Sequence, residues 1–360
     1  MPLIPFDYMA WAKAHQGRYA YDLSVSGMAP PEGDLFTLDP GCLTLQGVSA
    51  ALRARVKQAI ARMYGVAEPR VLLAAGTSET NFLVYGALLA PGDAVLVEAP
   101  TYQALARLGS VFGARTLSFA RRIEQDFTLD LGAIKRAWQP GVKLVALTSP
   151  HNPSGFAATR EALAELGGWL ESVDAYALVD EVYRDFDPHP PPVAQAIHPR
   201  LITTASLTKV YGLGGLRAGW ALMPETLVTQ AEQLFDFMAV NPAATMLNLA
   251  LSAFAALPRL RTRTIQRAQE NRARVAAWLA ASRCFTGNLP PHGIIALLRL
   301  PGGMDDRALV HDLAERHQVL AAPGAFFGLP GTIRIAYGMA PDRLAEALAR
   351  LEAGTRAFRA

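Results

Sequence analysis

The sequence predicts an α/β fold with a mostly parallel β-sheet, because short apolar runs alternate with longer helical patterns over the first two thirds of the chain. A length of 360 residues, 51% of them hydrophobic, allows a large core and favours two domains. After about residue 240 the alternation gives way to long helices and scattered strands. We therefore expect a larger domain over residues 45–240, and a smaller α+β domain formed by residues 1–44 and 241–360.

Strands of the larger domain are expected where short aliphatic runs lie between turn signals. They cover residues 71–75, 94–97, 142–147, 176–179 and 201–204. Helices are expected at residues 52–64, 79–89, 160–172 and 262–281, and the strands of the smaller domain at residues 294–300 and 332–336. The uncharged stretch 237–258 is expected to form a buried helix at a domain or subunit contact, because its asparagines, prolines and hydroxyl residues would be costly in a membrane.

Composition argues against several classes of protein. The formal charge of +3 is spread along the chain, which disfavours a nucleic-acid-binding surface and suits a small anionic ligand. The charged fraction of 18% is low, which favours a surface partly covered by a partner subunit. Cys42 and Cys284 are too few and too far apart for a disulfide framework or a zinc site. Residues 1–7 show no secretory signal, so a cytoplasmic protein without membrane span or metal is expected.

Polar residues follow the predicted strands at the edge where parallel sheets bind their ligands. Gly76, Thr77 and Ser78 follow the first strand and begin a helix, where hydroxyls and free amides suit an anion, although helix caps often have the same residues. Asn152, which precedes Pro153, is either a turn residue or a donor to a phenolic oxygen.

The later strands end in a carboxylate and an amine. Asp180 ends an apolar run and is either a helix cap or the partner of a buried cation, such as a protonated pyridine nitrogen. The last strand leads to Ser206 and Lys209, with Arg217 just beyond a glycine-rich stretch. This lysine can form a Schiff base with an aldehyde cofactor, while Ser206 and Arg217 hold the cofactor's phosphate.

Pyridoxal phosphate (PLP) accounts for these features together. The cofactor needs a lysine for its aldehyde, an acid for its ring nitrogen, donors for its phenolic oxygen and a phosphate site. An aromatic ring commonly stacks on its face, and Tyr102 is available for that position, where a core tyrosine is the alternative. The sequence thus predicts PLP as the cofactor.

At this point the sequence resembles the fold-type I PLP enzymes of the class I/II aminotransferase family. The resemblance spans nearly the whole chain, with the motifs in family order. It implies the aspartate aminotransferase-like fold, with a seven-stranded sheet in the PLP-binding domain. The matching runs begin at Ala75-Gly76-Thr77-Ser78-Glu79, Pro100-Thr101-Tyr102, Asn152-Pro153-Ser154-Gly155, Asp180-Glu181-Val182-Tyr183, Ser206-Leu207-Thr208-Lys209, Gly212-Leu213-Gly214-Gly215-Leu216-Arg217 and Ala322-Pro323-Gly324.

The resemblance implies a role for each matching residue. Lys209 holds the cofactor as a Schiff base and later moves the α-proton, and Asp180 pairs with the pyridine nitrogen. Asn152 and Tyr183 bond the phenolic oxygen, and Tyr102 stacks on the ring. The phosphate ligands would be Gly76, Thr77, Ser78, Ser206 and Arg217. Arg334 would bind the substrate α-carboxylate as a bidentate pair, with Asn152 beside it.

One region departs from the family pattern. Members often carry a tyrosine ahead of the glycine and the Leu-Arg pair found here at Gly47, Leu52 and Arg53, and that tyrosine reaches the phosphate of a neighbouring subunit. Cys42-Leu43-Thr44 occupies the region here. The segment 21–28 resembles the family segment that lines the substrate side of the cofactor.

The expected function is that of a homodimeric aminotransferase acting on an L-amino acid and a 2-oxo acid by a ping-pong mechanism through Lys209. A PLP-dependent lyase, decarboxylase or capreomycidine-synthase-like cyclase is the alternative, because the same site supports several reactions. A dinucleotide site is disfavoured by the spacing of Gly212, Gly214 and Gly219, and no Gly-Lys pair provides a P-loop. A PLP-binding regulator is disfavoured because the fold begins within about 40 residues, too few for a DNA-binding domain and linker.

Overall fold

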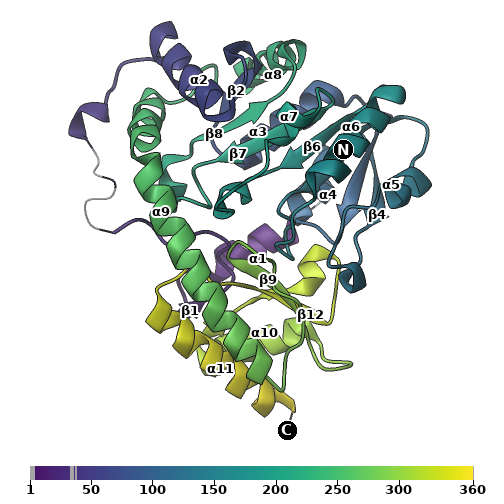
Figure 1. Cartoon of the computed structure of the whole chain (residues 1–360), viewed down its shortest axis with the longest axis vertical. Coiled ribbons are helices and arrows are strands. Elements are labelled where there is room, and N and C mark those ends of the chain that lie inside the picture. Colours follow the sequence, from purple (N-terminus) through teal and green to yellow (C-terminus); the bar gives the residue numbers. More distant parts are fainter. Residues whose placement is uncertain (1–4, 33–35, 37–38, 360) are drawn as a thin grey trace.

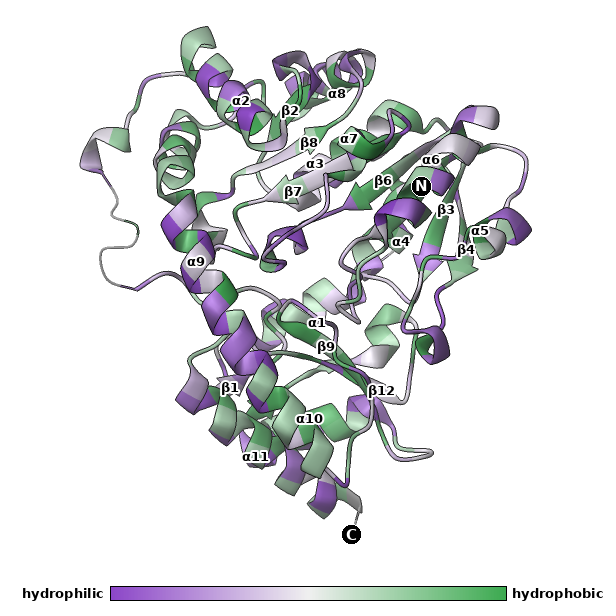
Figure 2. Cartoon of the chain, in the orientation of Figure 1, coloured by the Kyte–Doolittle hydropathy of each residue, from purple (hydrophilic) through white to green (hydrophobic). Residues whose placement is uncertain are grey.

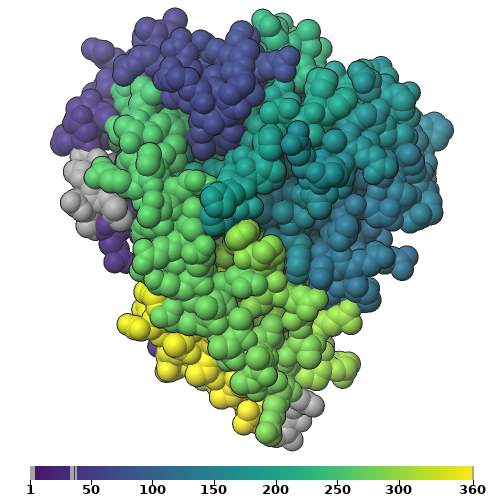
Figure 3. Space-filling model, in the orientation of Figure 1, coloured from purple at the N-terminus to yellow at the C-terminus, as the bar shows by residue number. Residues whose placement is uncertain are grey.

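The computed structural model describes residues 5–32, 36 and 39–359, so residues 1–4 of the opening segment lie outside it. The described chain forms a larger body on a seven-stranded sheet and a smaller body on a three-stranded sheet. Helix α9 (Ala244–Ala281) runs from the larger body down to the smaller one, and α1 (Asp7–His15) lies between the two (Figure 1). In the space-filling view the green residues of α9 lie on the surface along this path (Figure 3). We retain the division at residues 45 and 240 as a proposal.

The large sheet has the strand order β2-β8-β7-β6-β5-β3-β4. Neighbouring strands from β7 to β4 are parallel, and β8 alone runs antiparallel to both of its neighbours. The mostly parallel sheet is therefore confirmed. Its strands are β2 (Val71–Ala74), β3 (Ala94–Ala99), β4 (Arg115–Ala120), β5 (Val142–Thr148), β6 (Tyr176–Asp180), β7 (Leu201–Ser206) and β8 (Gly219–Leu222).

Helices cover both faces of this sheet. Along β5, Leu144 and Ala146 pack against helices on one face, whereas Val145 and Leu147 pack on the other. One face is covered by α3 (Thr77–Leu88), α4 (Gln103–Val111) and α8 (Glu225–Met238), and the other by α5 (Leu131–Ala137), α6 (Arg160–Ser172) and α7 (Ala194–Ile197). Figure 2 shows β6 coloured as strongly hydrophobic between them. This two-sided burial leaves the strand ends as the place for polar chemistry.

The smaller body joins both ends of the chain. Strands β11 (Ala322–Pro323), β12 (Thr332–Ala336) and β9 (Ile295–Arg299) form an antiparallel sheet, which confirms the predicted strands near residues 294–300 and 332–336. Strand β1 (Tyr21–Asp22) pairs in parallel with β10 (Val319–Leu320). The body is completed by α10 (Asp306–His317) and α11 (Pro341–Arg359), and helix α2 (Ala50–Tyr64) packs against α9 at the larger body.

The uncharged stretch 237–258 does not form one buried helix, contrary to the expectation. Phe237, at the end of α8, is 93% exposed, and the backbone leaves the helical conformation before α9 begins at Ala244. Pro242 lacks a backbone N–H and accounts for this break. From Ala244 onward the stretch joins the predicted helix 262–281 in one continuous helix that contains Pro258. No helix among the described residues is long and apolar enough to cross a membrane.

Candidate active site

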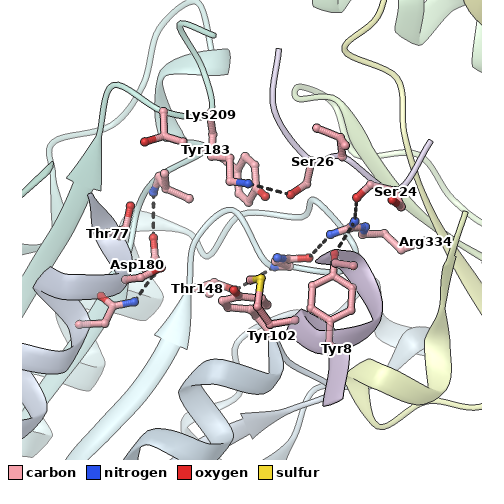
Figure 4. A pocket seen from close by; sticks show the side chains of 18 of the residues that line it. Tyr8, Ser24, Ser26, Thr77, Tyr102, Thr148, Asp180, Tyr183, Lys209 and Arg334 are labelled. Atoms are coloured by element: carbon pink, nitrogen blue, oxygen red, sulfur yellow. Dashed lines mark hydrogen bonds between the residues drawn. The ribbon is translucent and has the colours of Figure 1, made fainter. Parts of the chain in front are cut away.

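A cavity of about 340 Å³ lies at the carboxyl ends of the parallel strands, between the two bodies. Most of the predicted site residues line it: Thr77, Ser78, Tyr102, Asn152, Asp180, Tyr183, Lys209, Arg217 and Arg334. Figure 4 shows Arg334 and Tyr8 on one side of the site and Asp180 and Thr77 on the other, with Lys209 and Tyr183 between them. Gly76 and Ser206 lie directly behind the wall, in contact with Arg217 and Thr77. The structure therefore brings all of the predicted residues together.

Lys209 presents an amine to the cavity from the loop after β7. Its Nζ donates a hydrogen bond to Ser26 Oγ at 3.2 Å, and its backbone oxygen accepts one from Met28 N at 2.8 Å. Burial lowers the pKa of Lys209 to about 8, and repulsion from Arg334 adds to the effect while Asp180 opposes it. Near neutral pH the neutral, nucleophilic form of the amine is therefore much more populated than for an ordinary lysine.

Asp180 ends β6 with a carboxylate that is buried and 6% exposed. Oδ2 accepts a hydrogen bond from Asn81 Nδ2 at 3.0 Å, and Oδ1 accepts one from Val182 N at 3.2 Å. Thr204 Oγ1 donates to Asn81 Oδ1 at 2.8 Å and so orients that amide. Burial raises the pKa of Asp180 to about 6, although these bonds and the attraction to Lys209 oppose the shift. No described cation forms an ion pair with the carboxylate. The carboxylate can therefore form an ion pair with a cationic group that binds in the cavity.

The N-terminus of α3 and Arg217 form an anion-binding corner. Thr77 Oγ1 donates to Ser206 Oγ at 3.0 Å, and Arg217 Nη2 donates to Ala75 O at 2.9 Å. Gly76 has a φ of +90°, and a Cβ there would lie 2.6 Å from Arg217 Nη2. Any other residue would be strained at this φ, and its side chain would displace the Arg217 guanidinium from the corner. Free amides, hydroxyls and a cation at one corner suit a phosphate group.

Arg334, on β12, is fully buried at the opposite end of the cavity. Its Nη2 donates to Tyr8 Oη at 3.1 Å and to the backbone oxygen of Ser24, and Nη1 donates weakly to Asn152 Oδ1 at 3.4 Å. Its Nε has no partner, and within the described part of the chain no carboxylate pairs with the group. A buried guanidinium without an anion is costly unless a ligand supplies one.

Aromatic side chains close the remaining walls. Tyr102 lies edge-on to Tyr8, with ring centroids 6.0 Å apart. Burial raises the pKa of Tyr183 to about 12, so its hydroxyl stays protonated and can donate a hydrogen bond. Both phenol groups face the cavity that holds Lys209 (Figure 4).

A buried ion pair supports Asn152 from behind. Arg121 Nη1 lies 2.7 Å from Glu98 Oε2, and Glu98 Oε1 accepts from Thr148 N at 2.7 Å and Oγ1 at 2.8 Å. The backbone N of Asn152 in turn donates to Thr148 Oγ1 at 2.8 Å. The network fixes the loop after β5, so Asn152 enters the site from a rigid support.

Ser24 and Ser26 lie in the segment 21–28, which the family resemblance predicts beside the cofactor, whereas no role was assigned from the sequence to Tyr8, Asn81 or Thr148. Asn81 had a usable signal, because it lies one helical turn after Thr77 and so shares its face of α3. Tyr8 had none, because its contact with Arg334 joins residues 326 positions apart.

These residues fit pyridoxal phosphate. The anion corner, the unpaired Asp180 carboxylate and the Lys209 amine lie in one cavity and match the phosphate, the ring nitrogen and the aldehyde. The unpaired guanidinium of Arg334 leaves a second anion site for a substrate carboxylate.

Comparison with known proteins agrees with this geometry. A family model for aminotransferase class I and II matches residues 47–351. Capreomycidine synthase of Streptomyces vinaceus is 29% identical over 99% of this chain and 95% of its own length. Arginine–pyruvate transaminase of Pseudomonas aeruginosa is 31% identical over 84% of this chain and 79% of its own. The crystal structure of a PLP-dependent aminotransferase from Streptococcus suis matches with a TM-score of 0.92 at 24% identity, covering 99% of both chains. The chain belongs to the aminotransferase class I and II family of PLP-dependent enzymes.

Proposed function

We propose that this enzyme moves an amino group between an L-amino acid and a 2-oxo acid, with Lys209 as the residue that carries the chemistry. The observation behind this proposal is that one cavity holds the amine of Lys209 between two separate anion sites. The corner formed by α3 and Arg217 suits a phosphate, and Arg334 suits a carboxylate. A cofactor with a phosphate and a substrate with an α-carboxylate fit this arrangement together.

The residues that would hold the cofactor follow from their positions. Thr77, Ser78 and Arg217, with Gly76 and Ser206 behind them, would bind the phosphate. Asp180 would face the ring nitrogen, Asn152 and Tyr183 the phenolic oxygen, and Tyr102 the ring face. When bound, PLP supplies an aldehyde that combines with amines and a ring that withdraws electrons from the substrate α-carbon.

The chain's own groups then perform the remaining tasks. Arg334 binds the α-carboxylate and orients the α-carbon toward Lys209. The Lys209 amine, with a pKa lowered to about 8 by burial, accepts the α-proton as a general base and returns it as a general acid. Ser26 Oγ, which accepts a hydrogen bond from Nζ, fixes the position of that amine.

We further propose a cytoplasmic homodimer. Large apolar side chains are exposed on the segment after Cys42, which contacts the start of α9, and at the end of α8 and the loop that leads into α9: Leu43, Leu45, Phe237, Met238 and Val240. Leu45 and Phe237 are almost fully exposed in the single chain. A surface of this kind favours burial against a second copy, next to Arg217 and the anion corner.

Absorbance spectroscopy of the purified enzyme tests the proposed reaction. The visible absorbance of bound cofactor should fall when the donor amino acid is added, and one equivalent of 2-oxo acid should appear. Adding a 2-oxo acid should restore the absorbance. A Lys209→Ala variant should bind cofactor but show no turnover, and normal turnover in that variant would contradict the role of Lys209.

A capreomycidine-synthase-like cyclisation is the second candidate. The observation that favours it is the match to capreomycidine synthase, which spans nearly the full length of both chains. The spectroscopic test separates the two candidates. A cyclase would consume its amino acid without release of a 2-oxo acid and without loss of the visible absorbance at the end of the reaction.

A further inference from the structure

The cavity extends well beyond the groups that the proposed reaction uses. One face of α1 and its C-terminal neighbour line it, from Tyr8 through Met9 and Ala12 to Gln16. At 1.5 Å per helical residue, this wall runs about 12 Å outward from the Arg334 end. Tyr8 is buried at the inner end and Gln16 is exposed at the mouth. The space suits a long, extended substrate side chain.

Asp22 places a carboxylate on the wall of the same cavity. Oδ1 accepts hydrogen bonds from Ser24 N at 2.8 Å and from Ser24 Oγ at 2.6 Å. Oδ2 accepts none from any described residue, and no described lysine, arginine or histidine forms an ion pair with the half-buried group. The side chain is therefore held in place with one oxygen left for a ligand.

The other charges of the cavity wall are already engaged. Lys209, Arg217 and Arg334 serve the reaction and the two anion sites, and Asp180 lies deeper in the site at the end of β6. Asp22 is the one carboxylate on the described wall that these tasks leave without a partner. A cationic group on the substrate could form an ion pair with this carboxylate.

Ser24 links Asp22 to Arg334. Its backbone N and hydroxyl donate to Asp22, and its backbone oxygen accepts from the Arg334 guanidinium. The two opposite charges are thus held at a short, fixed separation on one side of the cavity. An amino acid with its α-carboxylate on Arg334 could therefore bring the end of its side chain to Asp22 within the same cavity.

We propose that the amino-acid substrate carries a cationic side chain, and that Asp22 binds that cation; this inference rests on the proposed function. A guanidinium is the expected cation, because it is more weakly hydrated than an ammonium and one of its N–H groups can donate to the free Oδ2. The Gln16 side-chain oxygen at the mouth is available as a further acceptor. Asp22 is thereby a specificity-determining residue that takes no part in proton transfer.

L-Arginine and L-citrulline test the proposal directly, because they have the same length and shape and differ in the charge of the terminal group. Loss of visible absorbance on titration measures the affinity of the wild-type enzyme for each. We expect arginine to bind at least about tenfold more tightly, as a hydrogen-bonded charge pair implies. The rise in Tm that each produces in the Lys209→Ala variant, which binds cofactor but does not turn over, gives the same comparison without turnover. Equal values for arginine and citrulline by both measurements would overturn the proposal.

Asp22→Asn is the matching variant, because its amide oxygen can still accept the Ser24 bonds. The variant should bind arginine about tenfold more weakly than wild type, and its affinity for citrulline should change by less than about twofold. Asp7→Asn, which removes a carboxylate from the exposed start of α1, should leave both unchanged. Retention of the arginine preference in Asp22→Asn would also overturn the proposal.

If no amino acid changes the absorbance of wild-type enzyme, the proposed function fails; if neutral amino acids react as well as arginine, only the charge inference fails.

Discussion

At the scale of single residues, the lowered pKa of Lys209 predicts when its amine becomes reactive. Burial and the nearby Arg334 bring this pKa from 10.5 to about 8. In cofactor-free enzyme, labelling of Lys209 by acetic anhydride should therefore rise with pH to a midpoint near 8, whereas a model lysine peptide keeps the ordinary midpoint. Peptide mass spectrometry measures both. A midpoint near the ordinary value would contradict the lowered pKa.

Asp180 predicts a pH dependence of stability. Burial raises its pKa from 3.8 to about 6, so the folded, cofactor-free state holds the proton more tightly than the unfolded state. The proton on Asp180 therefore contributes to the free energy of unfolding. This contribution is fully present below pH 4 and is lost as pH rises through 6, an effect on the order of 2–3 kcal/mol. The Tm of Asp180→Asn minus that of wild type should therefore increase from pH 4 to pH 7. Asp236→Asn, on the exposed face of α8, should show no such increase.

Arg334 affects both substrate affinity and the catalytic amine. Arg334→Met should raise KM for the amino acid about 10- to 100-fold, because a charge-assisted pair is lost. The same change should raise the labelling midpoint of Lys209, since Arg334 repulsion lowers that pKa. Steady-state kinetics and labelling check the two effects separately. An unchanged KM would mean that another group binds the carboxylate.

At the scale of secondary-structure elements, the contact between β8 and the start of α3 shapes the anion corner. A Cβ on Gly219 would lie 2.5 Å from the backbone of Gly76, which leaves no room for any side chain. Gly219→Ala should therefore push Gly76 away from Arg217 and weaken cofactor binding more than tenfold, by analogy with other overpacked sites. Gly168→Ala, where a Cβ meets nothing within 4 Å, is the control. Fluorescence titration of cofactor-free enzyme measures the change.

Elements with a local signal were predictable from sequence, and those that depend on distant contacts were not. Asp180 ends a strand with a clear apolar run, and Lys209 follows a short strand between turn signals, so their place at the sheet edge could be inferred from pattern alone. Strand β8 was missed because its four residues follow a glycine-rich loop that has no strand signal. Arg334 gained its role only from the family resemblance, since a lone arginine on a strand is usually a surface residue.

At the scale of the whole molecule, the exposed apolar surface predicts the oligomeric state. Light scattering should give twice the chain mass of 38.7 kDa for wild type. Phe237→Asp should shift the enzyme toward the single-chain mass, because a charge would be placed in the proposed contact. Phe358→Asp, at the far end of α11 with 37% exposure, is the matched control and should remain dimeric. A monomeric wild type would remove this part of the proposal.

The pairing of β1 with β10 has a consequence during synthesis of the protein. Tyr21 pairs with Val319 and Asp22 with Leu320, so β1 cannot pair until almost the entire chain has been synthesised. At about 5–20 residues per second, a ribosome needs roughly 15–60 s to bridge that interval. The anion corner and Lys209 are complete within the first 217 residues, whereas Tyr8 and Ser24 meet Arg334 only near the end. We therefore expect the cofactor-binding residues of a nascent chain to be present well before the substrate-binding side of the cavity can form.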